Sequence, residues 1–180
     1  MRVIAGSLGG RRLKAPSGKV TRPTSDRVRE ALFGMLGEIT GARVLDLFAG
    51  TGALGIEALS RGAGHAVFVE QDSRVSRVLR ENLESLGIGE EIADVRRTGA
   101  IAALRSAQAR KETYDLLFID PPYSLAHDLG PELSAILPSL LEPAARVVTE
   151  SDRRSPLRLA LEIERERRYG DTSITIHRQP

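Results

Sequence analysis

Short apolar runs alternate along most of the chain with stretches in which apolar residues recur every three or four positions. The first pattern predicts strands and the second predicts helices. The runs lie at about 43–48, 65–70, 91–97, 114–119 and 145–149, and the helical stretches at about 53–61, 73–86, 99–110 and 131–141. Repeated alternation of this kind predicts a parallel sheet that helices cover on both faces through right-handed crossovers.

The beginning of the chain departs from this alternation. Met1 to Lys19 has few large apolar side chains and a turn signal at Gly9-Gly10, which predicts a small hairpin or arm. A helix follows, because the apolar residues between Val28 and Ile39 form a single stripe. Thr24 or Ser25 can cap its first free N–H groups.

The end of the chain also departs from the alternation. Residues 159–168 and 172–177 are two extended segments joined at Gly170-Asp171, which predicts an antiparallel hairpin. The expected fold class is therefore α/β, a mostly parallel sheet with a C-terminal antiparallel hairpin and a small N-terminal hairpin or arm. The 180 residues are most simply one domain, with a hairpin and helix at 1–40 and a core at 41–180.

The first strand-to-helix junction is rich in glycine. It reads Gly50-x-Gly52-x-x-Gly55 after an apolar run that ends at Phe48. Glycine lets a ligand approach the main chain, and free N–H groups at a helix start favour polar or anionic ligand groups. Glu70 closes the next apolar run roughly 20 residues later, where such folds place an acid that binds a ribose. The pattern predicts a nucleoside cofactor and leaves its identity open, since three glycines alone are a weak signal.

A second motif, Asp120-Pro121-Pro122-Tyr123, follows the apolar run at 114–119. Ligands of open α/β sheets bind at the carboxyl ends of the strands. The prolines stiffen this loop and remove two N–H donors, which leaves carbonyl acceptors beside the Asp120 carboxylate. Acceptors next to an aromatic ring suit a planar amine, which offers two N–H groups and a face for stacking. A rigid turn with a packing Tyr123 is the structural alternative.

The net charge of +2 is unevenly distributed. Residues 1–40 carry eight basic and three acidic side chains, which leaves the rest of the chain at −3. A basic segment on a slightly acidic body predicts an anionic partner, with nucleic acid as the first candidate. A solvated basic surface is the alternative that charge alone leaves open. The candidates for contact with nucleic acid are Arg2, Arg11, Arg12, Lys14, Arg22, Arg27 and Arg29.

Composition excludes several kinds of chemistry. The chain has no cysteine, which excludes disulfides, thiolate metal sites and cysteine nucleophiles. Its three histidines, His65, His127 and His177, have no metal-ligand spacing, so no metal site is expected. No apolar run is long enough to span a bilayer, and no signal-peptide segment precedes the first arginines. We therefore expect a cytoplasmic protein without a membrane partner.

Together the two motifs resemble those of a known enzyme superfamily. The segment from Asp46 to Gly52 and the Asp120–Tyr123 segment look like motifs I and IV of class I S-adenosylmethionine-dependent amino-methyltransferases, which have a Rossmann-like sheet. Three further segments resemble the bacterial 16S rRNA guanine-N2 methyltransferases of the RsmD type. They are Arg2–Gly6 with Gly10–Leu13, the run from Arg22 to Phe33 (RPTSDRVREALF), and the ending Tyr169–Thr172.

This resemblance implies a role for each matching residue. Asp46, Phe48, Gly50 and Gly52 would line the methionine part of S-adenosylmethionine, and the product S-adenosylhomocysteine would leave the same place. Glu70 would hold the ribose hydroxyls and Gln71 would lie near the adenine.

The acceptor site would be formed by the second motif. Asp120 and the Pro121 carbonyl would hold the guanine amine, Pro122 would stiffen the loop, and Tyr123 would stack on the base. The chain departs from the superfamily pattern at Arg97-Thr98-Gly99-Ala100, where a side chain for the adenine amine is often found.

The resemblance also implies the partner. The substrate would be 16S rRNA within the 30S subunit or its assembly intermediate, at a guanine of the helix 31 loop. A monomer is the default expectation, because the sequence does not indicate an oligomeric state. Other amino-methyltransferases, which act on adenine N6 of DNA or RNA or on protein glutamine, remain alternatives. An NAD-binding oxidoreductase and a non-catalytic RNA-binding module are further alternatives. The intact cofactor motif argues against the module, and the Asp120 loop would be unexplained in the oxidoreductase.

Overall fold

The computed structural model describes residues 1–16, 25–152 and 156–179. Seven strands form one sheet in the order β3-β2-β1-β4-β5-β7-β6. The strands are β1 (Arg43–Asp46), β2 (His65–Val69), β3 (Ala93–Arg96), β4 (Tyr114–Ile119), β5 (Leu141–Asp152), β6 (Glu162–Tyr169) and β7 (Thr172–Arg178). The helices are α1 (Asp26–Leu36), α2 (Ala53–Ser60), α3 (Ser73–Leu86), α4 (Ala100–Ala109), α5 (Tyr123–Ile136) and the 3₁₀ turn η1 (Leu137–Leu140).

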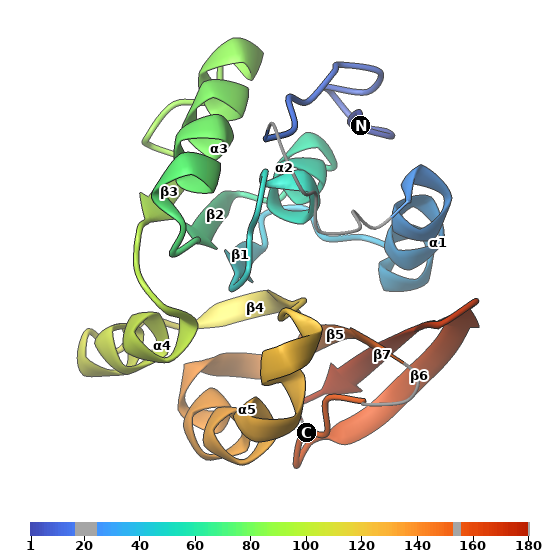
Figure 1. Ribbon diagram of the computed structural model, residues 1–180, viewed down its shortest axis with the longest axis vertical. Coiled ribbons are helices and arrows are strands. Elements are labelled where there is room, and N and C mark those ends of the chain that lie inside the picture. Colours follow the sequence, from blue (N-terminus) through green and yellow to red (C-terminus); the bar gives the residue numbers. More distant parts are fainter. Residues whose placement is uncertain (17–24, 153–155, 180) are drawn as a thin grey trace.

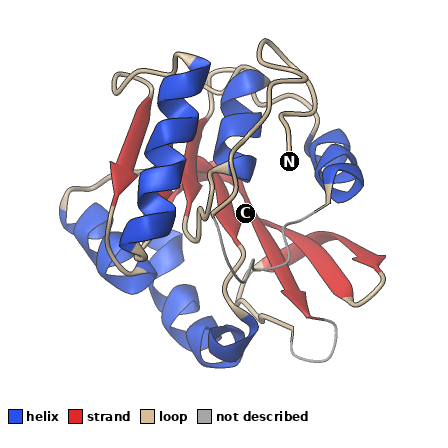
Figure 2. Ribbon diagram, turned by 45° about the horizontal axis from the view of Figure 1, so that its top comes forward, coloured by secondary structure: helices blue, strands red, loops and turns tan. Residues whose placement is uncertain are grey.

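Helices cover both faces of the sheet, as the alternation predicts. Helices α1, α2 and α3 pack on one face and α4 and α5 on the other; in Figure 1 the first group lies in the upper half of the picture and the second in the lower half. Each layer has its own buried cluster, one around Phe68 and Phe118 and the other around Leu117 and Leu104. Figure 2 shows the same arrangement, with the hairpin of β6 and β7 projecting from one side of the sheet.

The pairing of strands confirms the expected fold class. Strands β1 to β5 pair in parallel, and β7 pairs antiparallel with both β5 and β6. The parallel strands bring the ends of β1, β2 and β4 to one edge, where both predicted motifs emerge. None of the helices in the described part of the chain is long and apolar enough to cross a membrane.

The helix after β4 begins earlier than the pattern predicts. It was expected at about 131–141, yet α5 begins at Tyr123, directly after the two prolines, and ends at Ile136. Pro131 lies inside it. The apolar spacing is clear only in the second half, where Leu133 and Ile136 pack into the core. The first half borders the loop of the second motif, so its residues do not follow a core pattern.

The N-terminal arm contains a single antiparallel bridge between Arg2 and Arg12 in place of two strands. Its main chain is fastened to α2 instead. The N–H groups of Ile4 and Ala5 donate to the carboxylate of Glu57 at 2.7 and 3.1 Å. A Cβ added to Gly6 would lie 1.8 Å from the Ser60 carbonyl oxygen, so this close approach requires glycine.

Helix α1 packs its apolar side on the sheet near β4. Ser25 is its N-cap, and the Val28 N–H donates to the Ser25 hydroxyl at 3.3 Å. The rings of Phe33 and Phe118 lie 5.7 Å apart. Phe33 is buried together with Leu32 and Leu36. These contacts hold α1 over the end of the sheet where the second motif lies.

Candidate active site

The three glycines of the first motif have different surroundings. A Cβ at Gly52 would lie 2.4 Å from Leu79, and one at Gly55 would lie 2.3 Å from the ring of Phe68. These two glycines therefore allow α2 to pack tightly. A Cβ at Gly50 would meet only the Phe48 carbonyl oxygen, at 4.0 Å. Gly50 has a φ of +55°, and it is the glycine of the three at which a ligand can approach the main chain.

Asp46 ties the end of β1 to the start of α2. The Gly55 N–H donates to its carboxylate at 3.1 Å. The side chain is 2% exposed, and burial raises its pKa from 3.8 to about 7, with a further contribution from the charge of Glu70. Asp46 thus supports the glycine turn from within, which is a positioning role beside the predicted cofactor site.

Glu70 closes the other side of the turn. Its carboxylate accepts from the Gly50 N–H at 3.0 Å and from the Asp72 N–H at 2.8 Å. A carboxylate has about four acceptor positions, so capacity remains for two hydroxyl groups. Burial raises the pKa of Glu70 despite these bonds. The position suits the ribose role that the sequence predicts.

Gln71 lies on the surface beside the segment in which the chain departs from the superfamily pattern. Its side-chain oxygen would be 3.8 Å from a Cβ built on Gly99. The side-chain amide of Gln71 thus stands where the missing residue after β3 would project. Phe48 is half-buried and packs against the lower cluster of the core.

Asp120 follows β4 at the same edge of the sheet. Burial raises its pKa well above the ordinary range, and the carboxylates of Glu150 and Asp46 raise it further. A small cavity beside it is lined by Leu32, Leu54, Ile119, Asp120, Val148, Glu150 and Ile174. The acceptor of the second motif therefore lies within electrostatic reach of Asp46 below the first motif. This juxtaposition links the two predicted sites.

The carbonyl oxygens of the two prolines differ in whether a backbone N–H group already donates to them. The Leu125 N–H donates to the Pro122 carbonyl at 2.9 Å, and Pro122 is the N-cap residue of α5. Its carbonyl is therefore engaged, which corrects the expectation that both carbonyls remain available as acceptors. Among the described backbone N–H groups, none donates to the Pro121 carbonyl. Tyr123 is the first residue of α5, and its side chain lies outside the described part of the structure.

These residues fit a nucleoside cofactor that carries a positive charge. Gly50 offers an open main-chain surface, and Glu70 offers acceptors for hydroxyls. Asp46, Glu70 and Asp120 form an acidic rim along the carboxyl ends of β1, β2 and β4. Burial, and to a smaller extent the neighbouring carboxylates, raises the pKa of Asp46 and Asp120, so a cation beside them would favour their ionised forms.

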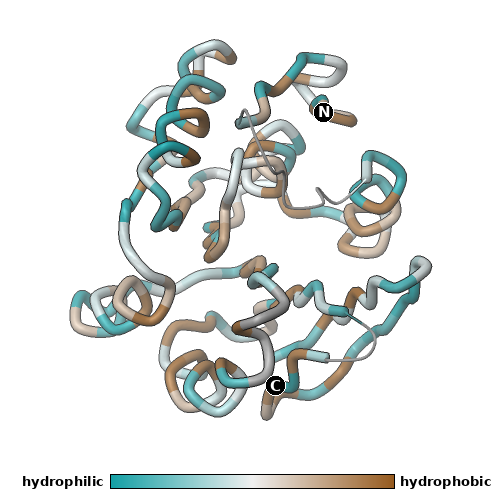
Figure 3. The backbone as a smooth tube through the Cα atoms, viewed as in Figure 1, coloured by the Kyte–Doolittle hydropathy of each residue, from teal (hydrophilic) through white to brown (hydrophobic). Residues whose placement is uncertain are grey.

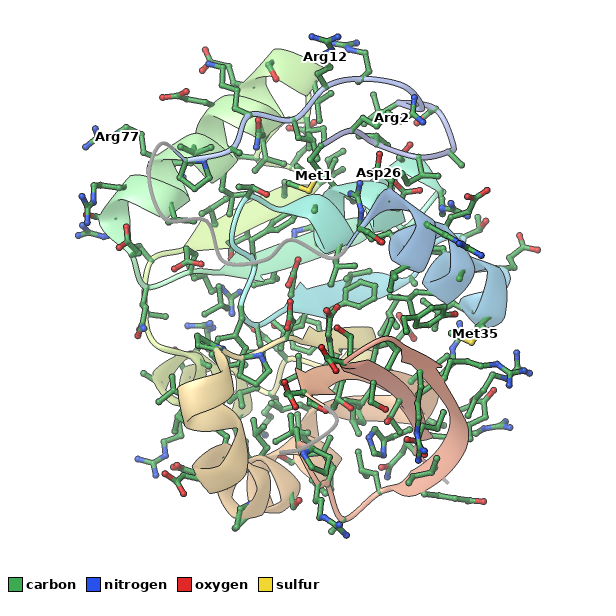
Figure 4. All side chains as sticks on the ribbon, turned by 45° about the vertical axis from the view of Figure 1, so that its right-hand side comes forward. Met1, Arg2, Arg12, Asp26, Met35 and Arg77 are labelled. Carbon is green, nitrogen blue, oxygen red and sulfur yellow. The ribbon has the colours of Figure 1, made fainter. Side chains whose placement is uncertain are left out.

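Most of the basic residues of the arm are engaged in local contacts. Arg2 pairs with Asp26 at 3.4 Å, Lys14 pairs with Glu81 at 3.0 Å, and Arg11 donates to the Ser85 carbonyl at 2.7 Å. Arg12 and Arg27 are exposed, and their side chains form no hydrogen bond or ion pair with another described residue. Figure 4 shows Arg12 directed away from the body of the molecule. Arg22 lies outside the described residues.

The prediction that Arg29 contacts nucleic acid is wrong. Its side chain is fully buried. The guanidinium donates to the Arg2 carbonyl, to the Asp26 carboxylate at 2.8 Å and to the Ala53 carbonyl at 3.4 Å. Arg29 therefore joins the arm, α1 and α2, and this is a structural role. Its spacing from Leu32, Phe33 and Leu36 on one face of the helix is the signal that indicates burial.

Two acidic residues that matter were missed in the sequence. Glu57 is fully buried, anchors the arm and pairs with Arg61 at 2.7 Å. It is the lone charge in the otherwise apolar stretch of α2, which was the available signal. Glu150 lies in β5 opposite Asp120, and only the register of β4 and β5 brings the two together.

The family model described as "Conserved hypothetical protein 95" matches residues 1–178. The chain belongs to this family. Its relatives confirm the resemblance to RsmD-type methyltransferases that the motifs indicate.

Two curated relatives cover most of the chain. "Putative rRNA methyltransferase YlbH" of Bacillus subtilis (strain 168) is 40% identical over 188 residues, covering 99% of both chains. "Ribosomal RNA small subunit methyltransferase D" of Haemophilus influenzae is 36% identical over 160 residues, covering 87% of this chain and 81% of that protein. A solved structure, "Putative methyltransferase yhhF from Escherichia coli", has a TM-score of 0.85 at 35% identity and covers 99% of this chain and 97% of that one.

Proposed function

We propose that this protein transfers a methyl group from S-adenosylmethionine to the exocyclic N2 amine of a guanine in 16S rRNA. The observation that carries the proposal is the position of Asp120. It lies at the end of β4, in a stiff loop, and within electrostatic reach of Asp46 under the glycine turn. The family and the names of its relatives support an rRNA substrate of the small ribosomal subunit.

The residues of the first motif would hold the cofactor. Gly50 allows close approach to the main chain, and Glu70 accepts the two ribose hydroxyls. Gln71 offers its amide near the adenine, beside Gly99. When bound, S-adenosylmethionine supplies an activated methyl group next to the acceptor site. The acidic rim favours its positive charge in this partly desolvated place.

The residues of the second motif would orient the amine. The lone pair of an exocyclic amine is delocalised into the base, so the amine is a poor nucleophile. Acceptors at both N–H bonds, from Asp120 and the Pro121 carbonyl, favour a tetrahedral nitrogen and expose the lone pair. They also stabilise the positive charge that develops on that nitrogen. Holding the amine in line with the methyl group lowers the entropic part of the barrier.

Labelled methyl transfer to unmethylated 30S particles, followed by identification of the methylated nucleoside, tests the proposal. We expect N2-methylguanosine, and a different methylated nucleoside would refute the assignment. Asp120→Ala should abolish transfer while S-adenosylhomocysteine still binds, because Asp120 holds the amine and not the cofactor. Thermal stabilisation by S-adenosylhomocysteine and not by NAD would separate the proposal from the oxidoreductase alternative.

The same proposal includes the form of the substrate, the location of the protein, its oligomeric state and its domain organisation. The substrate would be the 30S subunit or its assembly intermediate, because a chain of this size must rely on the shape of its substrate for part of its selectivity. We infer a cytoplasmic monomer organised as one domain over residues 1–180. Size-exclusion chromatography with light scattering tests the monomeric state, and methylation of naked rRNA at the same rate would argue against the particle as substrate.

A further inference from the structure

The edge of the sheet formed by β6 carries two arginines that face the same side as the active site. Paired residues of antiparallel strands point to the same face. Glu150 pairs with Ile174, and Ile174 pairs with Arg167. One row along, Val148 pairs with Ile176, and Ile176 pairs with Arg165. Glu150 and Val148 line the cavity beside Asp120, so Arg165 and Arg167 extend the active-site face outward.

A bulge in β6 produces this arrangement. The register shifts between Ile163 and Arg165. A shift by one residue moves each side chain to the opposite face of a strand. With a regular register continuing from Ile163, Glu164 and Glu166 would face the active-site side. The bulge therefore places two arginines where two glutamates would otherwise stand.

The two faces of β6 differ in how their charges are paired. On the face opposite the active site, Arg168 pairs with Glu166 at 3.2 Å, and Ser173 donates to Glu166 at 3.0 Å. On the active-site face, Arg165 and Arg167 are exposed, and their guanidinium groups form no hydrogen bond or ion pair with another described residue. Figure 3 shows β6 as a largely hydrophilic strand at the rim of the molecule.

The distance to Asp120 suits a polynucleotide. Asp120 directly follows β4, and Glu150, Ile174 and Arg167 lie on the successive strands β5, β7 and β6. Three strand spacings of about 4.8 Å place Arg167 about 14 Å from Asp120. A guanine held at Asp120 would therefore have flanking nucleotides above this face, with their phosphates within reach of the long arginine side chains.

We propose that Arg165 and Arg167 bind backbone phosphates of the rRNA strand that flanks the target guanine. This inference rests on the proposed function, since the two arginines would hold the strand so that its guanine reaches Asp120. The occupant is RNA, because unpaired guanidinium groups match phosphate geometry and release counterions when they bind it. Asp120 would hold the base itself, so the phosphates of the same strand would lie farther out, where these two arginines stand.

The test compares variants of the two faces of the same strand. We expect Arg165→Gln with Arg167→Gln to raise KM for unmethylated 30S particles about tenfold, because two phosphate contacts are lost. Each phosphate contact on a single strand contributes about 0.7 to the salt slope, so the salt slope of log(kcat/KM) should fall by about 1.4 for the double variant. The value of kcat at saturation should stay within twofold, since the chemistry at Asp120 is unchanged.

Arg168→Gln is the matched control. It removes one positive charge from the opposite face of the same strand, where Glu166 already neutralises the arginine. Its KM should change by less than twofold. Arg167→Lys should retain most of the affinity, because lysine preserves the charge. All variants should melt within about 2 °C of the wild type and bind S-adenosylhomocysteine equally, since they are exposed surface substitutions.

Three results separate the proposals. If wild-type protein methylates 30S particles and the Arg165/Arg167 double variant has an unchanged KM, this inference is overturned and the proposed function stands. An equal KM increase in Arg168→Gln would also overturn it, because a general charge effect would then be enough. If wild-type protein produces no N2-methylguanosine in 30S particles, the proposed function itself fails.

Discussion

The two basic regions of this protein use their arginines in opposite ways. In the N-terminal arm and α1, Arg29 is buried and joins three segments, and Arg2 and Lys14 are paired with carboxylates. In the β6–β7 hairpin, Arg165 and Arg167 are exposed and unpaired with any other described residue. The arm and α1 have the higher net positive charge, yet the hairpin presents two arginines on the active-site face.

Positive charge along a sequence therefore predicts binding only after pairing and burial are taken into account. A guanidinium that already donates to carbonyls or carboxylates must lose those bonds before it can bind a phosphate. An unpaired one on the surface loses only water. The following predictions test whether the arm is mainly structural and the hairpin mainly a binding surface.

The largest expected effect is on the anchor of the arm. Glu57→Ala should lower the free energy of unfolding by about 4 kcal/mol, because it leaves Arg61 and two main-chain N–H groups without their buried acceptor. Thermal or denaturant unfolding measures the change. Glu81→Ala, which removes only the exposed pair with Lys14, should cost less than about 1 kcal/mol and serves as the control. A small effect of Glu57→Ala would mean that the arm is not anchored as described.

The acidic rim between the two basic regions responds to pH, whereas arginines do not titrate. The pKa of Asp46 is raised from 3.8 to about 7 in the folded protein. Its contribution to stability is therefore fully present below pH 4 and is lost as the pH rises toward and through 7. Asp46→Asn keeps an acceptor for the Gly55 N–H and removes the titration.

Unfolding experiments on the wild type and Asp46→Asn at pH 4 and pH 8 measure this effect. The stability of the wild type relative to the variant should fall by about 4 kcal/mol between the two pH values. A difference between the two proteins that does not change with pH would contradict the raised pKa. S-adenosylmethionine should also bind more tightly as the pH rises through 7, because the rim then carries more negative charge.

A smaller effect is expected for the buried arginine of α1. Arg29→Met should lower the free energy of unfolding by about 2 kcal/mol, because the Arg2 carbonyl loses a buried donor and the Asp26 carboxylate loses its ion pair. The KM for 30S particles, measured below the melting transition, should stay within twofold of the wild type. A large increase in KM with unchanged stability would indicate that Arg29 contacts RNA.

Much of the fold could be predicted because it depends on patterns of short range. The strands and helices of the core follow from apolar periodicity, and the junctions at Gly50 and Asp120 follow from turn chemistry and their place after a strand. The bounds of α5 could not be predicted in this way, since its first half borders a loop and its spacing carries no core signal. Its actual start is determined by Pro122, which caps the helix.

The features that could not be predicted depend on contacts between distant segments. Glu150 acquires a role only because β5 lies beside β4 in a particular register. Gly52 and Gly55 look like ligand-binding glycines in the sequence, but Leu79 and Phe68 approach them from other elements. The bulge after Ile163 reverses the faces of β6 without any glycine or proline to mark it. Each of these requires the register or the packing to be known.

The smallest predicted effect returns to the arm. Arg12 is exposed without a partner among the described residues, whereas Arg11 donates to the Ser85 carbonyl. If the arm assists RNA binding, Arg12→Gln should raise KM for 30S particles by no more than about fourfold, the effect of one phosphate contact. Arg11→Gln should have a smaller effect because its guanidinium is already engaged. An Arg12 effect larger than that of the Arg165/Arg167 double variant would reverse the comparison, since the arm would then be the principal RNA-binding surface and the hairpin a secondary one.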